Sequence, residues 1–223
     1  MNTKFTRADL PIAYTMIETA GRIKPRRDGR HPIEKFFLLW TAFRQVYATI
    51  ASRQGLRTEL LTAEDGTVLS EQNGGVRIPQ VSPVEEREQI AAARAEFDKE
   101  LVRTLIAHPS VQYFAERTPF WGGGKIEQDA LGQRLNGVID VNHTSQAEYP
   151  VWAPLDREAL GRWSAGEGTA EDQALLARQI TDLLYAVSRN LTHVGRQFDD
   201  GQDIAIYEHA LPLVEMIVKG FTD

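Results

Sequence analysis

The pattern that most constrains the fold of this chain lies near its C-terminal end, between residues 170 and 221. Apolar residues recur there every three or four positions in two sets: Leu176, Ile180, Leu183, Leu184, Val187 and Leu191, and then Ile204, Tyr207, Leu211, Val214, Val218 and Phe221. This spacing places each set on one face of a helix. Gly195 and the Asp199-Asp-Gly201 turn separate the sets, so the sequence predicts two antiparallel helices joined by a short connection.

Polar residues interrupt the first apolar stripe near its C-terminal end, at Arg189, Asn190 and His193. Residues 189 and 193 would share a helix face if the helix persists to His193. One interpretation is that these side chains satisfy free backbone carbonyls at the helix end, where a cation complements the helix dipole. The other is phosphate chemistry, because an imidazole titrates near neutral pH and a guanidinium binds phosphate oxygens. Both interpretations remain open at this point.

The run from Leu184 to Arg196 resembles the last two helices of HEPN domains, which are all-helical modules with an Arg and a His at the end of one helix. His193 matches the histidine of the family, position 189 falls where the family usually has Asn or Asp, and Asn190 is carried over as a further site residue. Ser188 stands where the family carries its arginine, and Arg189 follows one position later as a substitute. The aromatic-rich segment 36–47 is similar to a core helix of these domains, so the resemblance covers two separated thirds of the chain.

The HEPN resemblance implies a metal-independent ribonuclease without a cofactor, in which Arg and His of two protomers face one RNA phosphate. Arg189 and His193 would then be catalytic in a homodimer cleft. If position 188 is the functional one, the serine hydroxyl cannot stabilise the added negative charge as a guanidinium does, and the site is inactive. The resemblance therefore favours a non-catalytic or weakly active RNA-binding or interaction module of a defence or toxin–antitoxin type, with the endoribonuclease as the alternative.

A second candidate feature is a basic segment between residues 22 and 31, which holds five cations and one anion. Its composition is typical of a loop. Arg26, Arg27 and Arg30, together with Arg196 after the terminal turn, are the candidate RNA-binding residues. The net charge of −6 argues against coating of nucleic acid over a broad surface, so any RNA contact must be local. The alternative is that the segment is a solvated connection.

The rest of the chain completes an all-α prediction. We expect helices over Asp9–Ile23 and Ile33–Arg53, a loop with a small hairpin from Gly55 to Val81, and one long helix from Pro83 to about Ala107. We expect the large aromatics of segment 36–47 to be core rather than a base-stacking platform. Residues 108–154 read as an irregular insertion, followed by a short helix capped by Asp156 and a helix capped by Thr169-Ala-Glu-Asp172. Pro212 predicts a kink or a late start in the last helix.

These patterns together predict a single HEPN-like domain over residues 1–223, an antiparallel helical bundle with a loop-rich insertion at about 108–154. Asp140, Asn142 and His143 lack the spacing of a metal site, and a turn cap is the favoured interpretation, so no metal is expected. The chain has no cysteine, no signal-peptide pattern and no membrane-length apolar run, so a cytoplasmic protein is expected. The expected partners are a second copy, RNA and an antitoxin-like protein, with no membrane.

Overall fold

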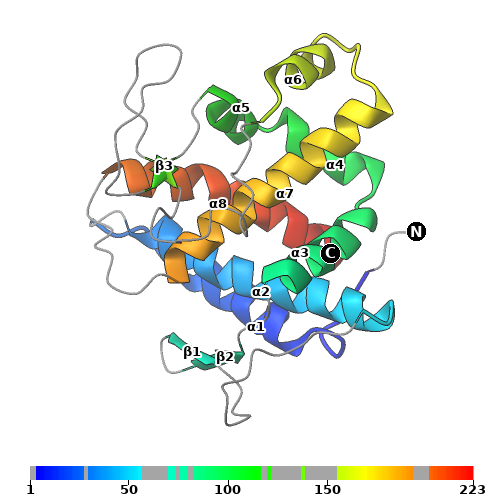
Figure 1. Cartoon of the computed structure of the whole chain (residues 1–223). Coiled ribbons are helices and arrows are strands. Elements are labelled where there is room, and N and C mark those ends of the chain that lie inside the picture. Colours follow the sequence, from blue (N-terminus) through cyan, green and yellow to red (C-terminus); the bar gives the residue numbers. More distant parts are fainter. Residues whose placement is uncertain are drawn as a thin grey trace.

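The computed structural model describes residues 4–27, 30–56, 70–73, 76–79, 83–116, 120–121, 137–138, 155–192 and 201–222. Helices dominate these ranges, which confirms the all-α class (Figure 1). They are α1 Pro11–Arg22, α2 His31–Arg53, α3 Pro83–Ala95, α4 Lys99–Ala107, α5 Pro109–Glu116, α6 Arg157–Ser164, α7 Ala170–Thr192 and α8 Gly201–Thr222. The strands are short: β1 Ser70–Asn73 pairs antiparallel with β2 Val76–Pro79, and β3 Phe120–Trp121 pairs in parallel with β4 Gly137–Val138. The β1–β2 pair confirms the predicted hairpin.

Helix α2 is the centre of the bundle and packs against α1, α3, α7 and α8. Its inward face carries Phe36, Trp40, Phe43 and Tyr47, each at most 5% exposed. The Phe43 ring lies 5.5 Å from Trp40 and 5.2 Å from Tyr47, both in edge-to-face orientations. Fully burying one such side chain contributes roughly 1.5–3 kcal/mol. The aromatic segment is therefore core, as predicted, and does not form a base-stacking platform.

Helices α2 and α8 run side by side in the same direction. Near their N-terminal ends the rings of Phe36 and Tyr207 are 5.4 Å apart. At the opposite end the Arg53 guanidinium lies 4.6 Å above the ring of Phe5, which in turn contacts Phe221 with a centroid distance of 6.3 Å. The C-terminal ends of α2 and α8 therefore meet at the N-terminal segment of the chain.

Helices α7 and α8 meet where α7 ends and α8 begins, as the terminal pattern predicts. The Tyr207 hydroxyl donates to the carbonyl of Val187 at 3.5 Å. The two helices then cross, and α4 packs against both of them (Figure 1). Helix α8 runs continuously through Pro212, so the predicted late start is wrong.

The prediction of a single long helix from Pro83 to Ala107 is wrong, because the helical conformation is interrupted between α3 and α4. Asp98 occupies the N-cap of α4 in an extended conformation, and its carboxylate accepts a hydrogen bond from the Leu101 N–H at 2.6 Å. A capping side chain satisfies a backbone donor that a new helix start leaves free. Since Phe97, Leu101 and Leu105 continue the fourfold spacing across this break, periodicity alone does not reveal it.

The predicted start of the irregular insertion at residue 108 is also wrong. Residues 109–116 form α5, which packs against α8 and buries Val111, Phe114 and Ala115 in the main core. Pro109 stands at its first position, where the missing N–H costs no helical hydrogen bond. Most of 117–154, including Asp140, Asn142 and His143, lies outside the described residues.

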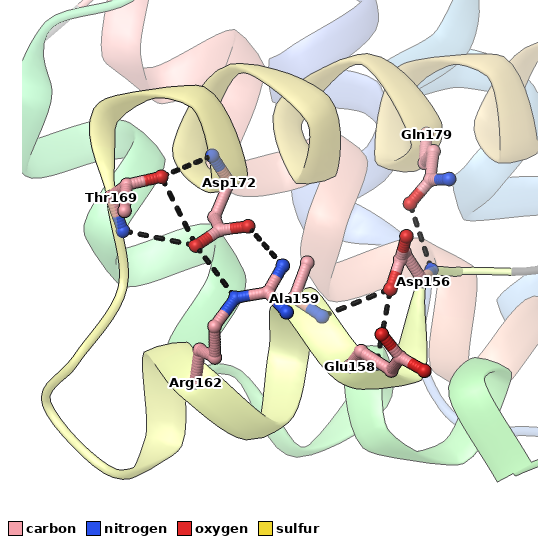
Figure 2. A network of polar contacts seen from close by, with 7 residues as sticks. All are labelled: Asp156, Glu158, Ala159, Arg162, Thr169, Asp172 and Gln179. Carbon is pink, nitrogen blue, oxygen red and sulfur yellow. Dashed lines mark hydrogen bonds and ion pairs between the residues drawn. The ribbon is translucent and has the colours of Figure 1, made fainter.

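The junction between α6 and α7 is closed by a network of polar contacts (Figure 2). Asp156 caps α6 by accepting from the N–H groups of Glu158 and Ala159, as predicted. At the start of α7, the Thr169 hydroxyl accepts from the Asp172 N–H at 3.1 Å, and the Asp172 carboxylate accepts from the Thr169 N–H at 3.0 Å. This reciprocal pair confirms the predicted cap. The Arg162 side chain adds two bonds to the same carboxylate, at 2.6 and 3.1 Å. We call Arg162, Thr169 and Asp172 the α6/α7 corner.

A tight turn brings the two helices of the corner together. Gly166 adopts a φ of +79°, a left-handed conformation that favours glycine, and its N–H donates to the Trp163 carbonyl at 3.0 Å. A Cβ added at Gly168 would lie 2.5 Å from the Trp163 side chain. Both glycines are therefore required by the geometry of this connection.

Among the helices described by the structure, none combines the length and the apolar character needed to cross a bilayer.

Candidate functional site

Three helix termini converge at one end of the bundle: the C-terminal end of α7 and the N-terminal ends of α2 and α8. Tyr207 joins them, because its ring packs on Phe36 of α2 and its hydroxyl reaches the Val187 carbonyl of α7. Figure 1 shows α7, in yellow to orange, ending on the same side of the molecule from which α8 and the blue end of α2 start. We call this end of the molecule the elbow end. It is where the sequence places its candidate site.

Of the predicted catalytic residues, the structure describes Ser188 and the backbone of residues 189 and 190, which lie at the elbow end. His193 and Arg196 are outside the described residues, and of Arg189 and Asn190 the structure describes only the backbone, in the last turn of α7. Their predicted roles therefore stay predictions. Ser188 is 5% exposed and its hydroxyl donates to the Tyr185 carbonyl at 2.7 Å. The Ser188 side chain is thus directed to the backbone of its own helix.

The basic connection between α1 and α2 also lies at the elbow end. Arg26 donates to the Glu34 carboxylate at 2.7 Å, which attaches the connection to the first turn of α2. The side chains of Arg26, Arg27 and Arg30 are exposed. The structure therefore brings three of the four predicted RNA-binding residues to the elbow end.

A buried carboxylate joins α2 to α3. Glu86 is 4% exposed, accepts a hydrogen bond from the Tyr47 hydroxyl and lies 3.3 Å from Nε of Arg44. Burial and the neighbouring carboxylate raise the pKa of Tyr47 well above its usual range, so the phenol remains a donor at every physiological pH. Glu86 is therefore committed to the fold and is already paired with cations and donors of α2.

Four charged residues that sequence reasoning did not single out face one another between α3 and α7. The Arg94 guanidinium donates to the Thr181 hydroxyl at 3.1 Å, and the Arg87 guanidinium lies 5.5 Å from the centre of the Tyr185 ring. Arg94, Arg87 and Arg178 all act electrostatically on the carboxyl of Asp182. We call Arg87, Arg94, Arg178 and Asp182 the α3–α7 seam. Sequence alone carries no signal for it, because its members come from helices about ninety residues apart.

Desolvation in the seam disfavours the ionised forms of two of its side chains, those of Arg94 and Asp182. Burial lowers the pKa of Arg94; the Asp182 carboxylate opposes this shift, while repulsion by Arg178 adds to it. Desolvation raises the pKa of Asp182, whereas Arg94, Arg87 and Arg178 each lower it. The four named members of the seam are thus three arginines, which act electrostatically on Asp182 without a direct hydrogen bond to it, and one carboxylate.

Two further described histidines, His108 and His209, pack where α5 meets α8. The His209 ring stacks on Tyr113 with centroids 3.7 Å apart, and its Nδ1 lies 3.3 Å from the hydroxyl of Ser110, which is 3% exposed. His108 accepts a hydrogen bond from the Ser110 N–H at 3.2 Å, so it caps the start of α5, and burial lowers its pKa. Nowhere in the described ranges do three or more His, Cys, Asp or Glu side chains gather as a metal site would require.

No protein-family model matches this chain, and neither curated proteins nor solved structures include a significant match to it.

Proposed function

We propose that this protein is a HEPN-like RNA-binding module, inactive or weakly active as a nuclease, which holds RNA phosphates at the elbow end of the bundle. The observation that supports the proposal is the convergence at Tyr207, since it brings the exposed cations of the α1–α2 connection to the end at which α7 terminates. Backbone phosphates supply most of the affinity of non-specific nucleic-acid binding. A local cluster of exposed arginines at a helix terminus is suited to that contact.

The ion pair between Arg26 and Glu34 does not prevent this role. Their side chains are 56% and 39% exposed, and exposed pairs of this kind contribute only about 0–1 kcal/mol. A phosphate oxygen can therefore replace the Glu34 carboxylate as the partner of Arg26 at little cost. The inward-directed Ser188 hydroxyl supports the non-catalytic form of the proposal, because it supplies no cation at the family's arginine position.

The test is fluorescence anisotropy of labelled single-stranded RNA in EDTA, across a series of salt concentrations. We expect Arg26→Gln/Arg27→Gln to lower the slope of log K against log salt by about 1.4, at about 0.7 per phosphate contact. Arg103→Gln, which removes an exposed cation from α4, is the matched control and should bind as the wild type does. Absence of RNA binding at low salt, or equal binding by the double variant, would overturn the proposal.

The endoribonuclease alternative is supported by the continuation of α7 through residue 189 to Thr192, since residues 189 and 193 share a face if the helix persists to 193. It predicts RNA cleavage that survives EDTA and disappears in His193→Ala, because no metal takes part. The HEPN resemblance places such a site between two copies of the chain, so light scattering should then report a dimer. Full RNA binding without cleavage decides for the non-catalytic module.

A further inference from the structure

Within the α3–α7 seam, three arginines accompany one carboxylate, that of Asp182. Arg94 has a structural role through its bond to Thr181, a fully buried residue of α7. Arg178 is exposed and lies near a second guanidinium, that of Arg94, which it repels. The nearest buried carboxylate of α3, Glu86, is already used by Tyr47 and Arg44. Like charges held close together destabilise a surface unless an anion shares it.

The seam leads toward the elbow end. Arg87 lies at Tyr185 and Arg94 lies at Thr181, so α3 and α7 run antiparallel, and these two arginines of α3 follow one another along α7. Arg178 of α7 lies near Arg94. Residue 189 follows Arg178 by eleven positions, which is about three turns and returns the α7 backbone to the same side of the helix. From residue 178 to residue 189 the helix rises by about 16 Å.

We infer that the α3–α7 seam is a track for the phosphates of a single RNA strand, which passes along Arg178, Arg94 and Arg87 toward the end of α7. This inference rests on the proposed RNA-binding function and extends it from the elbow end to the side of the bundle. A stacked strand carries one phosphate for each ~3.4 Å, so a track of about 16 Å accommodates roughly five phosphates.

The chemistry of the seam fits a strand better than a single small anion. The guanidinium groups are spread along two helices instead of surrounding one point, and each can donate to a separate phosphate. Asp182 lies among them and accounts for one negative charge, which leaves two cations without a charge equivalent in the seam. An added phosphate oxygen would also relieve the electrostatic cost of partly burying Arg94 beside Arg178.

The test measures RNA affinity and its salt dependence for two seam variants, again with Arg103→Gln as the control. Arg178→Gln should lower the salt slope by about 0.7, and Arg87→Gln/Arg178→Gln by about 1.4, which corresponds to roughly fivefold weaker binding per cation at 0.1 M salt. Asp182→Asn should act in the opposite direction and tighten binding, a change that damage to the fold would not produce. Thermal unfolding of each variant confirms that it is folded.

The outcomes separate the track from the function on which it rests. Binding that depends on Arg26 and Arg27 but is unchanged in both seam variants overturns the track and leaves the RNA-binding function intact. Absence of RNA binding by the wild type overturns both. Weaker binding in the seam variants with tighter binding in Asp182→Asn establishes the track.

Discussion

Helix α7 carries two arginine–aspartate arrangements of opposite design. At its N-terminal end, in the α6/α7 corner, Arg162 makes two hydrogen bonds to Asp172, and Thr169 uses the remaining capacity of the same carboxylate (Figure 2). In its middle, in the α3–α7 seam, three arginines act on Asp182. The first arrangement is balanced in charge and hydrogen bonds, whereas the second has an excess of cations.

The pKa shifts of the two aspartates follow this difference. The hydrogen bonds from Arg162 and Thr169 hold the pKa of Asp172 far below its usual range, so the carboxylate stabilises the fold in its ionised form. Asp182 is exposed, yet desolvation by the neighbouring helix raises its pKa in spite of the three arginines that act on it. The comparison indicates that a satisfied corner serves stability, whereas a seam with unbalanced charge is suited to a ligand.

A fall in pH should distinguish most clearly the contributions of the two aspartates to stability. The folded pKa of Asp172 is depressed, so its stabilising effect is complete above the unfolded pKa of about 4 and is lost as the pH falls below it. We expect the Tm of the wild type to exceed that of Asp172→Asn at pH 6, and the two curves to converge toward pH 2. For Asp182 the sign is reversed, because its folded pKa is raised, so the fold gains stability from this group as it becomes protonated. Parallel Tm curves for Asp172→Asn and the wild type would contradict the comparison.

Tyr47→Phe tests whether Glu86 is committed to the fold instead of being available to neutralise the seam. The change removes a hydroxyl donor from a carboxylate that is 4% exposed, and such a loss costs about 1–3 kcal/mol. Denaturant unfolding measures this cost. A double-mutant cycle with Glu86→Gln should show that the two changes are not additive. A loss below ~0.5 kcal/mol would mean that the carboxylate does not depend on this donor.

Thr169→Ala removes the hydroxyl half of the reciprocal cap at the start of α7. Loss of an N-cap costs about 1 kcal/mol, and for a chain of this size that lowers the Tm by roughly 2–4 °C. RNA binding should not change, because the corner is not part of the proposed track. A binding defect in a variant with normal stability would break the distinction between the corner and the seam.

Arg178→Gln should have the smallest effect on stability, within about 0.5 kcal/mol of the wild type, because its side chain is exposed. Scanning calorimetry measures this directly. The relief of repulsion with Arg94 could raise the Tm slightly, whereas a fall of several degrees would show that Arg178 supports the fold. The seam would then resemble the corner, and its excess of charge would need another explanation.

Much of the fold follows from local sequence signals. The periodic apolar residues predict α1, α2, α7 and α8, and the caps at Asp156 and Thr169 give the starts of α6 and α7. The errors lie where periodicity gives no information. The apolar spacing continues across the Asp98 cap, so α3 and α4 read as one helix, and Pro109 is as compatible with a loop as with the helix start that it forms.

The candidate site likewise has one part that the sequence predicts and one part that it does not. Arg26, Arg27 and Arg30 were predicted from their local density, and the structure brings them to the elbow end because α1 and α2 form a hairpin. The seam could not be predicted, since Arg94 and Arg178 come near each other only when α3 packs against α7. Charge complementarity between distant segments depends on tertiary packing, which a single sequence does not display.

The Tyr14 hydroxyl lies 2.8 Å from the carbonyl oxygens of both Phe5 and Thr222, so the first and last parts of the described chain are held together at one end of the bundle. This end of the bundle is the one at which α2 ends. Helix α2 has 23 residues, so its first turn is about 33 Å away. A fluorophore or a surface tether attached at either terminus would consequently leave the opposite extremity of the bundle open to an incoming strand. In single-molecule and biosensor experiments the protein can thus be attached through either of these two parts of the chain.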